Sequence, residues 1–172
     1  MPAAYPPSTL ARRVLTVLIA LNLATGGLMV LAVAASFVFE ATLIEHFASR
    51  PTGIDPLPLV RGLRLFALVG LPIFPLLHLL LDNLRAVVRT VSEGDPFVPE
   101  NAVRLRRIAW LLLGVELLHL GFGVMAHRLS SANAEIEWTF SITGWVAVLL
   151  IFILTHVFEH GTRMRQDIEG TV

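Results

Sequence analysis

Four long apolar stretches, separated by short polar segments, limit how this chain can fold more than any other feature. They cover residues 14–39, 65–81, 108–126 and 138–158, about half of the chain. A helix needs roughly 20 apolar residues to cross the hydrocarbon layer of a membrane. Backbone N–H and C=O groups find no water in that layer, so a spanning segment of this length is helical. The pattern therefore predicts an all-α integral membrane protein, folded as a four-helix bundle.

The second stretch is the shortest, and its start depends on two arginines. Arg61 and Arg64 can extend their charged ends to the membrane surface while their methylene chains stay in lipid, so this span is predicted over 60–81. Pro72 and Pro75 lie inside it, and each removes a backbone donor and bends the helix. After the first stretch, the apolar residues within 43–47 predict a short amphipathic helix.

The composition predicts little mass outside the bilayer. Apolar residues make up 55% of the 172 residues and charged residues 15%, whereas soluble domains carry about 25% charged residues. Mean hydropathy is +0.74. We therefore expect residues 1–172 to form a single membrane domain. The absence of Cys excludes thiolate metal sites, and the net charge of zero argues against direct nucleic-acid binding.

The distribution of arginine predicts the orientation in the membrane. If both termini lie on the inner side, nine arginines lie there with them: Arg12, Arg13, Arg85, Arg89, Arg104, Arg106, Arg107, Arg163 and Arg165. The outer side then holds four: Arg50, Arg61, Arg64 and Arg128. Because positively charged segments next to the spans favour the cytoplasm, both termini are predicted to be cytoplasmic.

The segment between the second and third spans predicts a helical hairpin that extends into the cytoplasm. Apolar residues at 84, 87, 88 and 91 follow helical spacing, so the second helix should continue about three turns beyond the membrane. Gly94 is a typical helix terminator, and Pro99 suits the first turn of the next helix. Phe97 is then expected at the tip of the hairpin.

Three polar residues are expected near the middle of the membrane. Glu116 lies eight residues, roughly 12 Å, from the inner end of the third span, and Asn22 lies at a similar depth in the first. His119 shares a helix face with Glu116. A cluster of these three residues would act as a clasp between helices, or as a proton-accepting or ligand-binding site, since ionisable groups inside a membrane commonly mark one.

A haem site is an alternative hypothesis for two other histidines. His78 and His156 lie near the inner ends of the second and fourth spans, where two facing histidines could ligate a b-type haem. The competing interpretation is that both lie near the lipid headgroups. A di-iron site is not expected, because Glu116 and His119 form one Glu-x-x-His motif and no second one follows. We therefore expect no metal, and haem b only under this alternative.

Two stretches, GDPFVPENAVRLRRI over 94–108 and FEHGTRMRQDIEGTV over 158–172, identify a family. Together with the four spans, they resemble the bacterial membrane proteins grouped as domain of unknown function 2975. The resemblance implies a multi-pass protein of the bacterial cytoplasmic (inner) membrane with no established activity. Genes of this family commonly lie beside one for a small Cro/repressor-like helix-turn-helix protein, which implies a cytoplasmic transcription regulator as a partner.

These features favour a non-enzymatic membrane partner or sensor for such a regulator, and no catalytic residue is expected because no nucleophile–base set is recognisable. The candidate docking residues are Phe97, Arg104, Arg106, Arg107, Asp167 and Glu169. Alternatively, the arginines bind anionic lipid headgroups. Two other functions stay open: a haem- or quinone-associated redox protein, and a small proton-coupled transporter subunit that uses Glu116. A homo-oligomer is compatible with all of them.

Overall fold

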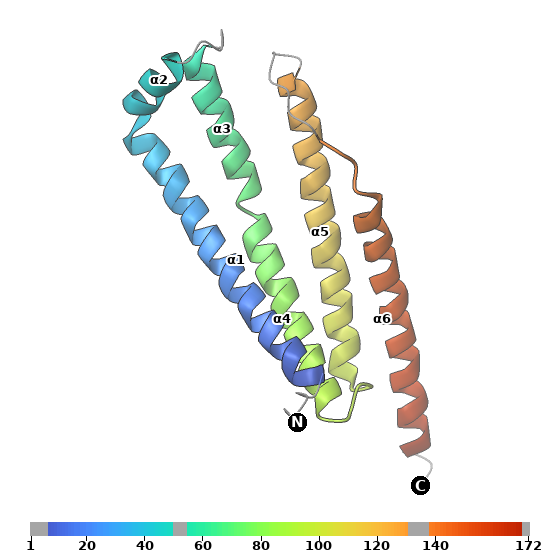
Figure 1. The fold of residues 1–172 in the computed structure, drawn as a ribbon. Helices are drawn as coiled ribbons and strands as arrows, with labels where there is room; N and C mark the ends of the chain where they lie inside the picture. The colour runs from blue at the N-terminus through green and yellow to red at the C-terminus, as the bar shows by residue number, and fades with distance from the viewer. Residues whose placement is uncertain (1–6, 50–54, 131–137, 170–172) are drawn as a thin grey trace, which may run out of the picture.

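The computed structural model describes residues 7–49, 55–130 and 138–169, and within these ranges the chain forms helices and no strand. Four segments are long and apolar enough to cross a membrane. The all-α multi-pass membrane fold is therefore confirmed (Figure 1). The helices are α1 (Pro7–Val38), α2 (Glu40–Ala48), α3 (Pro56–Gly70), α4 (Ile73–Ser92), α5 (Pro99–Ser130) and α6 (Ile142–Glu169).

The long helices lie side by side in chain order. Helix α1 packs mainly on α4, α4 on α5, and α5 on α6, so α1 and α6 lie at the two edges (Figure 1). The chain exposes 11799 Å², whereas a compact soluble chain of this mass exposes about 8,300 Å². Lipid is as apolar as the side chains themselves, so nothing drives the bundle to close as it would in water.

The second span is broken at its prolines, as predicted. Helix α3 ends at Gly70 and α4 begins at Ile73. Pro75 cannot donate to the carbonyl of Leu71, which instead accepts a hydrogen bond of 3.2 Å from the backbone N–H of Phe74. The break changes the direction of the span without leaving this carbonyl unpaired in the membrane.

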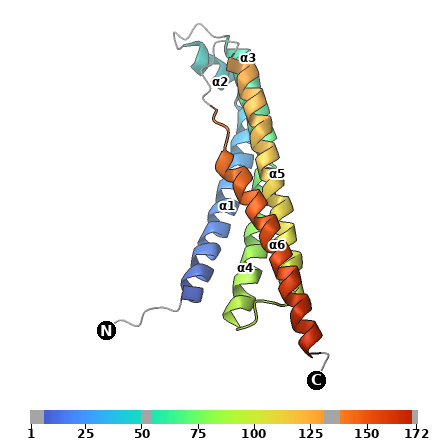
Figure 2. The same cartoon turned by 90° about the vertical axis from the view of Figure 1, so that its right-hand side faces the viewer.

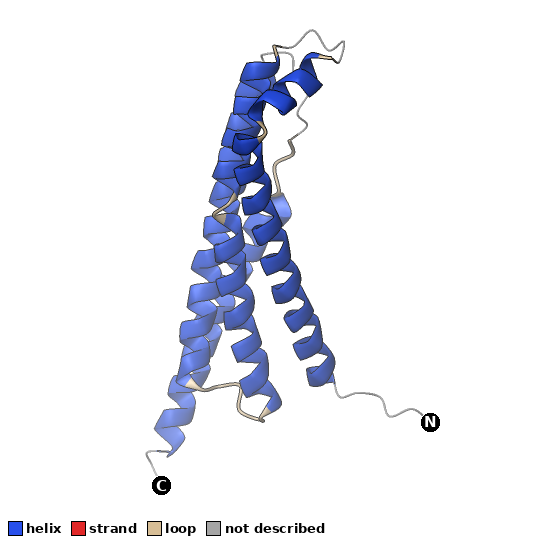
Figure 3. Ribbon diagram, turned by 90° about the vertical axis from the view of Figure 1, so that its left-hand side faces the viewer, coloured by secondary structure: helices blue, strands red, loops and turns tan. Residues whose placement is uncertain are grey.

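The start of α1, the α4–α5 connection and the end of α6 lie at the same end of the molecule, here called the terminal end (Figures 1 and 3). Helix α4 runs to Ser92, Gly94 has the positive φ of 93° that ends a helix, and Pro99 begins α5, all as predicted. Helix α6 continues past the α4–α5 connection (Figure 2). At the opposite end, α2 is the short helix predicted over 43–47.

Helix α6 begins later than the predicted fourth span. Residues 138–141 are not helical, and the helix starts at Ile142. The side chain of Ser141 accepts a hydrogen bond of 3.2 Å from the backbone N–H of Gly144, which is the geometry of a helix N-cap. Ser141, a polar residue within the apolar stretch, therefore determines where the helix begins.

Candidate functional site

Glu116 lies against the first turn of α6. Its carboxylate occupies the space that a side chain at Gly144 would fill, and the residue is 8% exposed. Gly144 is the third residue of α6. The N–H groups of a first helical turn carry a partial positive charge, which favours a nearby carboxylate. Because α6 begins beside Glu116, the partial positive charge of its first turn lowers the energetic cost of a carboxylate deep in the membrane.

Next to this contact, His119 and Trp138 bring two more polar rings together. The centroids of the two rings are 5.6 Å apart, and the indole lies directly on Gly123. Glu116 Oε2 and Trp138 Nε1 are both buried without a hydrogen-bond partner in the described part of the chain. As predicted from their spacing, Glu116 and His119 share the face of α5 that is turned toward α6 and the segment before it.

Asn22 does not join them, contrary to the predicted three-residue cluster. Its amide donates a hydrogen bond of 3.0 Å to the carbonyl of Phe74, near the start of α4. It also lines a cavity between α1 and α4 that includes His78. Similar depth in the membrane did not predict contact between Asn22 and Glu116. Helix α1 packs on α4, whereas Glu116 faces α6 on the far side of α5.

The two histidines of the haem hypothesis are also separated. His78 is on α4 in the cavity with Asn22, whereas His156 is exposed on α6, with its ring 6.0 Å from that of His160. Helices α4 and α6 pack on α5 from different sides (Figure 1). The structure does not bring the rings together, so the haem interpretation has no facing ligand pair.

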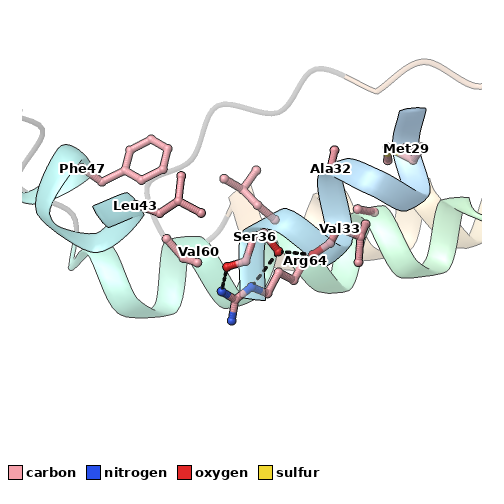
Figure 4. A pocket seen from close by; sticks show the side chains of 10 residues that line it. Met29, Ala32, Val33, Ser36, Leu43, Phe47, Val60 and Arg64 are labelled. Atoms are coloured by element: carbon pink, nitrogen blue, oxygen red, sulfur yellow. Dashed lines mark hydrogen bonds between the residues drawn. The ribbon is translucent and has the colours of Figure 1, made fainter. Parts of the chain in front are cut away.

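Arg64 is a polar centre that the sequence analysis did not identify. The residue is 8% exposed, and its guanidinium pairs with Glu40 at 2.7 Å and donates to the side chain of Ser36 at 3.0 Å. It also lies over the ring of Phe37, 4.3 Å from the centroid. Figure 4 shows the bonds between Arg64 and Ser36 beside an apolar cavity. The cavity lies between α1, α2 and α3 and has a volume of about 210 Å³.

Arg64 therefore directs its charge to Ser36 and Glu40, which lie at the outer end of the first predicted span and hold the guanidinium in place. The sequence contained a signal for this ion pair, since Glu40 follows the first span directly and Arg64 lies within the second. A charge of each sign at the same end of two neighbouring spans favours an ion pair between them.

Replacing Arg64 with leucine is expected to lower the free energy of unfolding by about 2 kcal/mol, because the half-exposed Glu40 loses its cation and Ser36 its charged donor. Leucine at position 61 provides a matched control, since Arg61 is exposed on the same helix. Thermal unfolding of the purified protein in detergent would measure both variants. Equal melting temperatures for the two would contradict a structural role for the Arg64 pair.

At the terminal end, Asn101 connects α4, the α4–α5 connection and α5. It is fully buried, at 0% exposure. Its amide donates to Pro96 O at 2.9 Å and to Thr90 Oγ1 at 2.7 Å, and its oxygen accepts from Arg104 at 2.8 Å. These bonds hold the α4–α5 connection on the ends of both helices.

The same connection is tied to α6. The ring of Phe97 packs on Phe158, with centroids 5.4 Å apart, and lies so close to Gly161 that a Cβ there would be 2.8 Å from the ring. Asp95 pairs with Arg165. The sequence suggested that Phe97 lies free at the tip of the hairpin, whereas in the structure it packs on α6. It is a half-covered contact, 40% exposed, between two segments far apart in the sequence.

The remaining docking candidates are distributed around this contact. Arg106 pairs with Glu159 of α6, and Arg104 is held by Asn101. The side chains of Arg107 and Asp167 are exposed. The side chain of Glu169 lies outside the described residues. Two of the predicted candidates, Phe97 and Arg106, therefore contact α6. Arg104 bonds instead to Asn101 within α5.

Comparison with known protein families identifies a match. The model of the family described as "Protein of unknown function (DUF2975)" matches residues 48–172, which include α3 to α6 and both stretches that meet at the terminal end. No curated protein and no solved structure matches.

Proposed function

We propose that this chain, which belongs to the DUF2975 family of proteins of unknown function, is a non-enzymatic membrane component that binds a transcription regulator. Binding takes place at the terminal end, which faces the cytoplasm of a bacterium while the four spans cross its inner membrane. The arginine distribution supports this orientation. The partner is the small helix-turn-helix protein implied by the family resemblance.

The observation that supports this most is that the two family stretches form one ordered surface at the terminal end. Phe97 on Gly161 and Asp95 with Arg165 hold the α4–α5 connection against α6. A segment that served only to reverse the chain between two spans would need neither contact. Such contacts orient the exposed side chains of both segments relative to each other, as a specific protein contact requires.

Exposed apolar side chains next to this contact favour a protein partner. Met164 is 57% exposed, six residues or about 9 Å beyond the predicted inner end of the fourth span. It lies one turn from Gly161, on which Phe97 packs. Together with the partly exposed ring of Phe97, Met164 forms an apolar area beside charged side chains, and apolar areas rimmed by polar residues are typical of a contact site on another protein. Arginines that only bound lipid headgroups would need no apolar neighbour of this kind.

The test uses the helix-turn-helix regulator encoded by the neighbouring gene, fused to a fluorescent protein. It measures how much of this fusion protein is recruited to membranes that contain the full chain. We expect Met164→Asp or Phe97→Asp to reduce membrane-bound fluorescence about tenfold or more, the loss that corresponds to about 1.4 kcal/mol of binding free energy. Val91→Asp is the matched control, since the apolar side chain of Val91 is exposed as well, at 48%, but lies on α4. Recruitment that is absent with the unchanged chain, or unaltered in both variants, would overturn the proposal.

A further inference from the structure

Arginines from two helices line two open cavities between the start of α1 and the end of α4, at the terminal end (Figures 1 and 3). The first cavity, of about 330 Å³, is lined by Arg12, Asp82, Arg85, Ala86 and Arg89. The second, of about 400 Å³, is lined by Arg12, Arg13, Thr16, Val17 and Arg85. Arg12 and Arg85 belong to both linings, and both residues are exposed, so a ligand in either cavity reaches them.

Positive charge exceeds negative charge in these linings. Within the described part of the chain, no carboxylate forms an ion pair with Arg12 or Arg85. Arg89 pairs with Glu93 at 3.8 Å, but both side chains are exposed, and such surface pairs contribute little. Among the described residues, Asp82 is the one carboxylate of the two linings. An anion is therefore the kind of ligand that these cavities attract.

The height of the arginines matches the phosphate layer of a membrane. Arg12 lies two residues, about 3 Å, outside the first predicted span, and Arg85 lies four residues, about 6 Å, beyond the second. The headgroup layer on each face of a bilayer is about 5–8 Å thick. Side chains tilt toward the N-terminus of their helix. Because α1 begins and α4 ends here, Arg12 leans away from the membrane and Arg85 leans back toward it, so both reach the level of the lipid phosphates.

An apolar strip on α1 leads from the second cavity into the predicted first span. Val17 lines that cavity and is 57% exposed, and Val14 and Leu21 are exposed as well. The three residues are spaced three and four apart, so they share one face of the helix. A phospholipid whose phosphate binds the arginines has its acyl chains beside this strip, whereas a soluble phosphate compound makes no contact with it. This continuity favours a lipid over a soluble anion.

We propose that Arg12, Arg85 and Arg89 bind the phosphate of an anionic phospholipid between α1 and α4. Guanidinium groups donate pairs of parallel N–H bonds to phosphate oxygens, and basic pockets between spans bind anionic headgroups of this kind. A zwitterionic lipid binds less tightly, because its own cation lies close to the arginines. This site does not depend on the proposed binding of a regulator.

Binding of tail-labelled lipids to the purified full-length protein in an uncharged detergent tests the proposal. Fluorescence anisotropy compares phosphatidylglycerol, which is anionic, with phosphatidylcholine that carries the same chains. We expect phosphatidylglycerol to bind at least about fivefold more tightly, and this preference to fall as salt is added. Equal affinities for the two lipids overturn the proposal. Displacement of the labelled lipid by glycerol 3-phosphate at a similar concentration identifies a soluble phosphate compound as the ligand and overturns the lipid assignment.

Variants of the lining locate the binding site. We expect Arg12→Gln combined with Arg85→Gln to weaken the binding of phosphatidylglycerol about 25-fold, which is about fivefold for each charge. The matched control combines Arg107→Gln with Arg163→Gln, which removes the same charge from exposed positions on α5 and α6. Asp82→Asn removes the carboxylate from the lining and should strengthen binding about fivefold, a gain that a misfolded protein would not give. Equal losses in the two double variants, or no gain in Asp82→Asn, would overturn the assignment.

Discussion

Replacing Asn101 with alanine is expected to lower the free energy of unfolding by about 3 kcal/mol. Three partners lose their bonds to the amide at once: Thr90, the carbonyl of Pro96 and the guanidinium of Arg104. A net contribution near 1 kcal/mol for each bond gives this sum. Asn101 itself is fully buried, so alanine leaves an empty space where the amide bonded to these three half-buried residues.

Denaturant titration of the protein in mixed micelles would measure this loss. Asn83→Ala is the matched control, because within the described part of the chain the Asn83 side chain on α4 bonds to the carbonyl of Leu79 in its own helix. We expect the control to change the free energy of unfolding by less than about 0.5 kcal/mol. Asn101→Asp should give an intermediate loss, since it keeps the oxygen that faces Arg104 but cannot donate to Pro96. If the alanine variants at 101 and 83 unfolded alike, Asn101 would not hold the connection.

Replacing Gly144 with alanine is expected to destabilise the contact between α5 and α6 by about 3 kcal/mol. The new methyl group takes the place of the Glu116 carboxylate. Either α6 moves away from α5, at a cost typical of overpacking, or the carboxylate turns away from the first turn of α6 and loses the favourable field there. A carboxylate in the middle of a membrane has no comparable position elsewhere.

A double-mutant cycle with Glu116→Ala separates this effect from a general effect of alanine on α6. In the Glu116→Ala background the space is empty, so Gly144→Ala should cost less than about 0.5 kcal/mol, and the coupling energy should exceed about 2 kcal/mol. Gly121→Ala serves as the control, because a Cβ at that position meets nothing. An equal cost of Gly144→Ala in both backgrounds would show that Glu116 does not rest on α6.

Local features of the fold followed from local features of the chain. The apolar lengths predicted the spans, the prolines of the second span predicted its break, and Gly94 and Pro99 predicted the end of α4 and the start of α5. Each of these depends on the covalent properties of one residue or on the period of a helix, which neighbours in space do not change. The start of α6 was predicted too early, because the apolar pattern begins before Ser141, whereas the side chain of Ser141 caps the helix.

The candidate sites depended instead on which helices are neighbours. Hydropathy and helical period place Asn22 and Glu116 at equal depth, but they do not say toward which helix each is turned, since four spans can pack in several orders. The tertiary structure decided this by placing α4 between α1 and α5. The sequence alone therefore determined that the protein crosses the membrane and where its second span bends. Only packing in three dimensions decided that Glu116 meets α6, that Arg64 meets Glu40, and that Phe97 lies on Gly161.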